Sequence, residues 1–256
     1  MEQYQKEFAK ILVENNILFF DQNLQLKDGR PSPYFVNIGV FGEKASLSST
    51  MGKYYAAMIK DQIDKGMKID IIFGPSYKGS AIALATALAL YQDYQIDLGA
   101  TYDRKESKAH GEGTADKNML VGAKLFDGCN VFMVDDVISS AATKFEAIEK
   151  LQSVAKNEGI TINIVGLGIA VDREQTTALY ENPDDITTVK LGIKGSNTIK
   201  EFTDKSKVPV IFVVKIRPVI EYLNDNKIPI LINNEKKPID ETTKRKFDEY
   251  LETYGT

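Results

Sequence analysis

The chain alternates strand-forming runs with segments that have the spacing of helices. The apolar, β-rich runs lie at 69–73, 96–102, 130–135, 161–172 and 208–216. Helical patterns separate most of them, and strands joined through helices pair in parallel. The pattern therefore predicts an α/β fold over 66–226, with a mostly parallel twisted sheet flanked by helices.

The rest of the chain is arranged around this core. Residues 1–45 predict a small N-terminal hood of one helix and short strands around a turn. An excursion at 176–200 mixes turn signals with one short β-like run, and a polar tail at 227–256 has a helical pattern. We expect one domain over residues 1–256, since nothing separates these parts like a linker.

Charge and cysteine content limit the function classes. The net charge is −4, from 32 basic and 36 acidic residues, whereas nucleic-acid-binding domains are usually basic. Cys129 is the only cysteine, so no disulfide forms within the chain, which suits a reducing compartment. No segment is typical of a signal peptide or a membrane span. We expect a cytoplasmic enzyme or binding protein with neither nucleic acid nor membrane as partner.

The stretch "VFMVDDVISSAAT" (131–143) ends a predicted strand with Asp135 and Asp136 and continues with small residues. Ligands bind beyond the carboxyl ends of parallel strands. Small residues at a helix start let backbone N–H groups approach a phosphate. Carboxylates repel phosphate unless they bind a cation or sugar hydroxyls. The stretch predicts a ribose phosphate site, and the alternative is a helix-capping aspartate with an incidental neighbour.

Two further segments carry cations at strand ends. In "GPSYKG" (74–79), Gly79 opens a predicted helix and Lys78 lies at its N-terminus, where a cation is unfavourable unless it meets an anion. In "TYDRKESKAHGEG" (101–113), a charged loop follows a strand, and such cations neutralise a pyrophosphate leaving group. For each segment the alternative is a set of solvated surface charges.

These three motifs, in this order, resemble those of type I phosphoribosyltransferases, and of orotate phosphoribosyltransferases in particular. The stretches "LKDGRPSPYFVN" and "AVDRE" are similar as well, and the likeness covers roughly residues 5–225 except 176–200. The resemblance implies the type I phosphoribosyltransferase fold. It also implies transfer of the phosphoribosyl group from 5-phosphoribosyl 1-diphosphate (PRPP) to orotate, with Mg²⁺, giving orotidine 5′-monophosphate and pyrophosphate.

The resemblance also implies roles for individual residues. The PRPP-binding residues would be Tyr77, Lys78, Asp135, Asp136, Val137, Ser139, Ser140, Ala141, Ala142 and Thr143. The two aspartates would hold ribose hydroxyls and Mg²⁺, directly or through water, although the metal would be bound mainly by PRPP. The catalytic residues that stabilise pyrophosphate would be Arg104, Lys105, Lys108 and His110. In the implied homodimer, loop 103–113 reaches the neighbouring active site.

Orotate would contact Lys27, Phe35, Ser139 and Arg173. Arg173 suits this role because a guanidinium binds a carboxylate through two hydrogen bonds, and orotate carries a carboxylate. The alternative for Arg173 is an ion pair with a neighbour in sequence, Asp172 or Glu174.

One departure from the family lies in the phosphate cradle. The usual Thr-Ala-Gly-Thr is here Ser-Ser-Ala-Ala, at 139–142. If the glycine position needs a positive φ, Ala141 costs about 1 kcal/mol. Two alternatives therefore stay open, a transferase for another base and a PRPP-sensing regulatory protein without catalysis. Lys27 and Arg173 argue against the first, and the complete cationic loop argues against the second.

Overall fold

A computed structural model describes residues 1–104, 119–138 and 141–256. The contacts divide the chain into two compact units, which we describe separately. The first unit contains residues 1–40, 171–201 and 214–256, and the second contains 41–170 and 202–213. The predicted organisation into a single domain stays a prediction, because contacts alone do not test independent folding.

A six-stranded sheet forms the centre of the second unit, in the order β5-β4-β3-β6-β7-β8. Its strands are β3 (Ile71–Gly74), β4 (Gly99–Asp103), β5 (Leu120–Gly122), β6 (Cys129–Asp135), β7 (Ile162–Asp172) and β8 (Val210–Lys215). Parallel pairs join β3 to β4, β3 to β6 and β6 to β7, whereas β5 is antiparallel to β4. The predicted mostly parallel sheet is confirmed, and the edge strand β5 is an addition.

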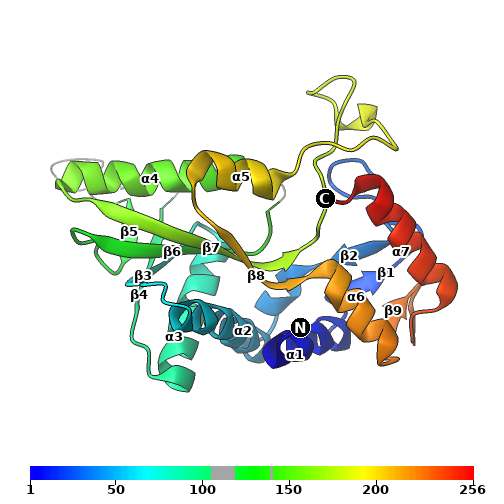
Figure 1. Ribbon diagram of the computed structural model, residues 1–256, viewed down its shortest axis with the longest axis horizontal. Helices are drawn as coiled ribbons and strands as arrows, with labels where there is room; N and C mark the ends of the chain where they lie inside the picture. Colours follow the sequence, from blue (N-terminus) through cyan, green and yellow to red (C-terminus); the bar gives the residue numbers. More distant parts are fainter. Residues whose placement is uncertain (105–118, 139–140) are drawn as a thin grey trace. The chain divides into compact units, whose positions relative to one another are not determined.

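Helices cover both faces of this sheet. Figure 1 shows α4 (Ala142–Glu158) on one face and α2 (Ala45–Asp64) and α3 (Lys78–Tyr94) on the other. Strand side chains alternate between faces. Phe73 and Met133 accordingly share a buried cluster with Leu151 of α4. The apolar runs of the sequence thus form strands covered by helices. Because β3, β4, β6 and β7 pair in parallel, their carboxyl ends lie at one edge of the sheet.

The first unit has its own four-stranded sheet, in the order β10-β9-β1-β2. Its strands are β1 (Leu18–Phe20), β2 (Tyr34–Val36), β9 (Ile230–Ile232) and β10 (Glu235–Lys237), and its helices are α1 (Gln3–Glu14), α6 (Ile216–Asp225) and α7 (Glu241–Tyr254). The predicted N-terminal helix and short strands are confirmed. The tail contains β9 and β10 besides the expected helix, and these strands pair with each other and, through β9, with the distant β1.

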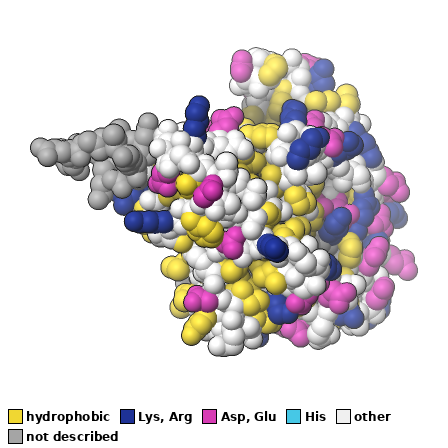
Figure 2. Space-filling view, turned by 60° about the vertical axis from the view of Figure 1, so that its left-hand side comes forward, with side chains coloured by type: hydrophobic (Ala, Val, Ile, Leu, Met, Phe, Trp, Pro, Cys, Tyr) yellow, Lys and Arg dark blue, Asp and Glu magenta, His cyan; other side chains and the backbone are white. Residues whose placement is uncertain are grey.

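The excursion at 176–200 has little regular structure. A single β-bridge joins Tyr180 to Val189, a 3₁₀ turn spans Ile186–Thr188, and α5 (Thr198–Ser206) begins at its end. On the face drawn in Figure 2, lysine and arginine side chains are interspersed with acidic ones. Within the described ranges, no helix is both long and apolar enough to cross a membrane.

Candidate active site

A tight turn joins β3 to α3 and carries Tyr77 and Lys78. A Cβ on Gly74 would lie 1.8 Å from the carbonyl oxygen of Gly79, so only glycine fits there. The turn is also tied to the next strand, because the Ser76 amide donates to Oδ1 of Asp103 at 2.6 Å. The peptide bond between Ser76 and Tyr77 is cis. Lys78 lies at the N-terminus of α3 as predicted, and the helix begins with it, one residue before the expected start at Gly79.

The ends of β3, β4 and β6 border a cavity of about 530 Å³ in the second unit. Its lining residues are Pro75, Ser76, Tyr77, Lys78, Asp103, Asp135, Asp136, Thr143, Glu146, Ala147 and Lys150. Five predicted PRPP-binding residues therefore share one cavity: Tyr77, Lys78, Asp135, Asp136 and Thr143. The rule that ligands bind beyond the carboxyl ends of parallel strands accounts for their convergence.

Asp136 pairs with the cation at the start of α3. Its Oδ2 lies 2.7 Å from Nζ of Lys78, and its Oδ1 accepts the Val137 amide at 2.8 Å. The Lys78 side chain is 64% exposed, whereas that of Asp136 is 14% exposed, so the lysine is readily hydrated outside the pair. A phosphate-bearing ligand can therefore take Lys78 from Asp136, provided that the carboxylate gains other contacts in exchange.

Asp135 is held from inside the protein. One carboxylate oxygen pairs with Nζ of Lys144, the other accepts the Asp136 amide at 2.9 Å, and the Tyr55 hydroxyl donates to the Asp135 carbonyl at 2.7 Å. Burial raises the pKa of Asp135, and the charge of Lys144 opposes that rise. The two neighbouring aspartate side chains are about equally buried, at 13% and 14% exposure, and they differ in their partners, since Lys144 is buried and Lys78 is exposed.

Asp103 and Lys150 form a third ion pair at the cavity. Asp103 ends β4 just as Asp135 ends β6, so the strand-end rule could have identified it from the sequence. Lys144 and Lys150 were missed because both lie on α4, where polar residues are ordinarily solvated. Their roles become visible only once the helix is packed against the sheet.

The structure describes only some of the remaining predicted site residues of the second unit. The Arg104 amide donates to the Met119 carbonyl at 2.8 Å. Ala141 has φ −78° and ψ −13°, so the cost expected for a lost glycine does not arise. Ala142 begins α4. Outside the described residues lie Lys105, Lys108, His110, Ser139 and Ser140, so their roles stay predictions.

Arg173 follows β7 in the first unit, and its sequence neighbours bind other cations. Asp172 lies 4.0 Å from Nζ of Lys215, and Glu174 accepts the Arg217 amide at 2.8 Å. Nε and NH2 of Arg173 are buried and have no hydrogen-bond partner among the described residues. The alternative of an ion pair with a sequence neighbour is therefore wrong, and these two donors suit a carboxylate.

The other two predicted orotate residues of the first unit differ in exposure. Lys27 is exposed in the turn before Gly29. Phe35 lies half-buried on β2, with its ring centroid 5.9 Å from that of Phe19. These positions are compatible with ligand contact, and the assignment of both residues stays a prediction.

Asp135 and Asp136 suit a metal ion that is bound mainly by the phosphates of a ligand. Among the described residues no group of three histidine, cysteine, aspartate or glutamate side chains is placed to hold a metal ion. Mg²⁺ needs six oxygen ligands and commonly takes most of them from phosphates and water. Asp136, with one oxygen paired only to the exposed Lys78, is the better placed aspartate for such a contact.

Comparison with known proteins defines the class. Residues 50–195 match the phosphoribosyl transferase domain, and the chain belongs to the phosphoribosyltransferase family. Within it, the relatives are orotate phosphoribosyltransferases. That of Pseudomonas syringae pv. tomato is 33% identical over 227 residues, covering 89% of this chain and 92% of the relative. That of Clostridium acetobutylicum is 32% identical over 255 residues, covering 100% and 99%.

Solved structures agree with these sequence relatives. The crystal structure of orotate phosphoribosyltransferase from Francisella tularensis has a TM-score of 0.70 to this chain at 28% identity, and the match covers 98% of each chain. The likeness therefore extends to the tail (227–256), which lies beyond the matched domain.

Proposed function

We propose that this protein is an orotate phosphoribosyltransferase, a pentosyltransferase of pyrimidine nucleotide synthesis. It transfers the phosphoribosyl group of PRPP to orotate and releases pyrophosphate. The observation that carries the base assignment is Arg173, whose two buried guanidinium nitrogens have no partner within the described chain. A carboxylate satisfies both donors at once, and among the common nucleobase substrates orotate has one.

The second unit supplies the contacts for PRPP in this proposal. Asp136 binds the ribose hydroxyls after Lys78 turns from it to the diphosphate. Asp135, held by Lys144, fixes the end of β6 behind it. The start of α4, with Thr143 in the cavity, offers backbone N–H groups to the 5-phosphate.

Catalysis then consists of positioning and charge stabilisation. The bond from ribose C1 to pyrophosphate breaks while the orotate nitrogen attacks from the opposite face, and positive charge develops on the ribose. Arg104, Lys105, Lys108 and His110 neutralise the departing pyrophosphate. Asp136 and Asp135 would help PRPP to hold Mg²⁺, which would supply charge neutralisation for the leaving group.

We also propose a homodimer. Leu84, Leu88 and Tyr91 lie one helical turn apart on α3, and each is 53% exposed. Such an apolar stripe is typical of a helix that packs against another protein surface, and a second copy of this chain would cover it. In the dimer, loop 103–113 of one subunit would complete the active site of the other.

Base selectivity tests the assignment. Purified protein with Mg²⁺ and PRPP is given orotate, uracil or adenine in turn, and consumption of each base is followed by absorbance. We expect turnover with orotate alone. Arg173→Lys should raise the KM for orotate by about tenfold or more, because lysine cannot form the paired hydrogen bonds. Turnover with adenine or uracil but not orotate would identify a transferase for another base. PRPP binding without turnover on any base would identify a regulatory protein.

A further inference from the structure

The chain beyond Arg173 is fastened to the C-terminal end of the tail (227–256). The amide and the hydroxyl of Thr176 both donate to the Tyr254 carbonyl, at 2.8 and 2.9 Å. The Thr256 amide donates to the Glu174 carbonyl at 3.0 Å, and Gln175 and Gly255 form an antiparallel bridge. The last residues of the tail thus lie alongside 174–176, directly after the predicted orotate-binding arginine.

Helix α7 also reaches Arg173 through Tyr34. The side-chain amide of Gln175 donates to the hydroxyls of Tyr250 at 2.9 Å and Tyr34 at 3.1 Å. The Tyr34 hydroxyl in turn donates to the Arg173 carbonyl at 3.2 Å. The guanidinium carbon of Arg173 lies 5.8 Å from the centre of the Tyr34 ring. Tyr34 therefore contacts both the backbone and the side chain of Arg173, and Gln175 links Tyr34 to Tyr250 of α7.

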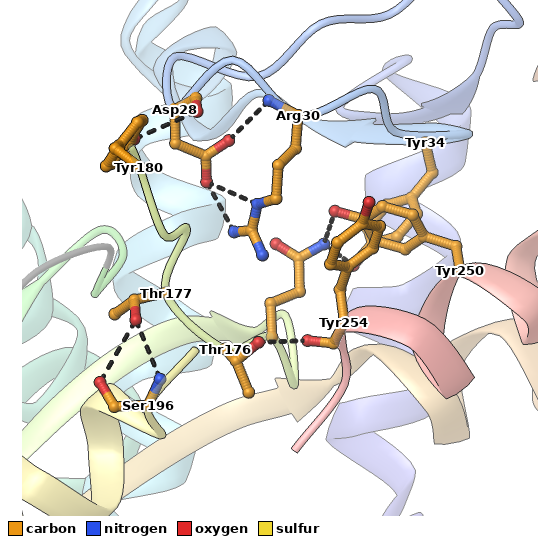
Figure 3. A network of polar contacts seen from close by, with 10 residues as sticks. Asp28, Arg30, Tyr34, Thr176, Thr177, Tyr180, Ser196, Tyr250 and Tyr254 are labelled. Carbon is orange, nitrogen blue, oxygen red and sulfur yellow. Dashed lines mark hydrogen bonds and ion pairs between the residues drawn. The ribbon is translucent and has the colours of Figure 1, made fainter. Parts of the chain in front are cut away.

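The turn that carries Lys27 is stabilised by Tyr180 of the excursion and by Tyr254 of the tail. The Tyr180 hydroxyl donates to the Asp28 carbonyl at 3.1 Å, and Asp28 binds Nε and NH2 of Arg30 at 3.1 and 2.6 Å. Arg30 lies over the Tyr254 ring, at 5.3 Å from its centre. The Tyr254 hydroxyl accepts the Gly192 amide at 2.8 Å. Figure 3 shows turn, excursion and tail meeting around Tyr254.

We propose that Tyr254 and the tail end are positioning elements for the base substrate. The Tyr254 carbonyl accepts hydrogen bonds from the segment after Arg173, and its hydroxyl accepts one from the excursion. Its ring packs against Arg30 in the turn after Lys27. This inference rests on the proposed function, and it gives the excursion and the tail a shared role. Side chains fixed before the ligand arrives lose less conformational freedom on binding, which increases affinity for that ligand alone.

Three variants and one control test the role. Tyr254→Phe removes the hydroxyl, Tyr254→Ala also removes the ring under Arg30, and Thr176→Val removes one of two bonds to the Tyr254 carbonyl. Tyr222→Phe, a half-buried tyrosine of α6, is the matched control. KM values for orotate and PRPP, kcat and thermal unfolding are measured for each.

We expect a selective loss of orotate affinity. The KM for orotate should rise about threefold in Tyr254→Phe and Thr176→Val, and about tenfold in Tyr254→Ala, the range for one or more lost hydrogen bonds. The KM for PRPP and kcat should stay within about twofold of wild type, and the control should be unchanged.

Contrary results are distinguishable. An unchanged orotate KM in both Tyr254→Phe and Thr176→Val, with wild-type folding, would overturn the inference. Equal rises in the KM values for both substrates would show a general structural role and would also overturn it. If Tyr254→Ala does not fold, the two milder variants still decide. A wild-type protein that does not use orotate would instead refute the proposed function.

Discussion

Asp135 and Asp136 are neighbours in sequence, yet they contact different lysines in different surroundings. Lys144 is 6% exposed in its pair with Asp135, whereas Lys78 is 64% exposed in its pair with Asp136. Breaking a buried pair leaves an unpaired charge in the interior, whereas an exposed lysine is readily hydrated. Lys144 therefore stabilises the strand end, and Lys78 is available to a ligand.

Lys144→Met tests the buried pair. We expect a loss of about 3 kcal/mol in the free energy of unfolding, because the carboxylate of Asp135 stays buried without its cation. Urea denaturation measures the change, and Lys60→Met, which breaks the exposed pair with Asp64, is a control expected to cost less than about 1 kcal/mol. The double variant Lys144→Met/Asp135→Asn should regain part of the loss. Full additivity of the two single losses would contradict coupling between these residues.

At the residue scale, the sequence predicted groups at strand ends and at the start of α3, and it missed the two lysine partners within α4. Asp135, Asp136 and Lys78 were found because strand ends and helix starts have recognisable patterns. Lys144 was not found, since burial of one polar residue of a helix depends on packing that no local pattern encodes. Ala141 was expected to be a possible weak point, yet its right-handed backbone needs no glycine.

Helix α7 (Glu241–Tyr254) is capped by Asp240, the residue that precedes it. Oδ1 of Asp240 accepts the Thr243 amide at 2.8 Å, and this hydrogen bond lowers the pKa of Asp240 from its ordinary 3.8. A carboxylate with a lowered pKa stabilises the fold above its unfolded pKa, and the contribution is lost as the pH falls through the lowered value. Tyr250 and Tyr254 lie on the same helix, so its stability bears on the proposed base contacts.

Asp240→Ala should lower the free energy of unfolding by about 1 kcal/mol at neutral pH, the usual cost of a lost helix cap. The difference from wild type should shrink as the pH falls below 3.8, where the wild-type carboxylate gains its proton. Chemical denaturation at several pH values measures it. Asp240→Asn, which keeps a capping oxygen, serves as the control. A difference between wild type and Asp240→Ala that grows toward acid pH would refute the capping role.

At the element scale, length decided what the sequence could predict. Helices α1, α3, α4 and α7 were expected, since each spans three or more turns of periodic sequence. The strands β5, β9 and β10 have three residues each and were not predicted. Their existence depends on pairing with distant segments, as β9 pairs with β1.

At the scale of the whole molecule, we predict that two inactive variants complement each other in mixed dimers. Chains with Lys105→Ala and chains with Asp136→Ala should each have little activity. If loop 103–113 crosses to the neighbouring site, mixed dimers regain one intact site of two, so co-expressed chains should recover about a quarter of wild-type activity under random pairing. Sedimentation analysis checks that dimers form. Dimers without recovered activity would show that each loop serves its own subunit.

The most direct test of the whole account is the balance of the reaction itself. Wild-type protein is incubated with Mg²⁺, PRPP and orotate, and the products are quantified by mass spectrometry and a pyrophosphate assay. We predict equal amounts of orotidine 5′-monophosphate and pyrophosphate for each PRPP consumed, and no consumption without orotate. Pyrophosphate released at the same rate without orotate, or no orotidine 5′-monophosphate at any orotate concentration, would contradict the account.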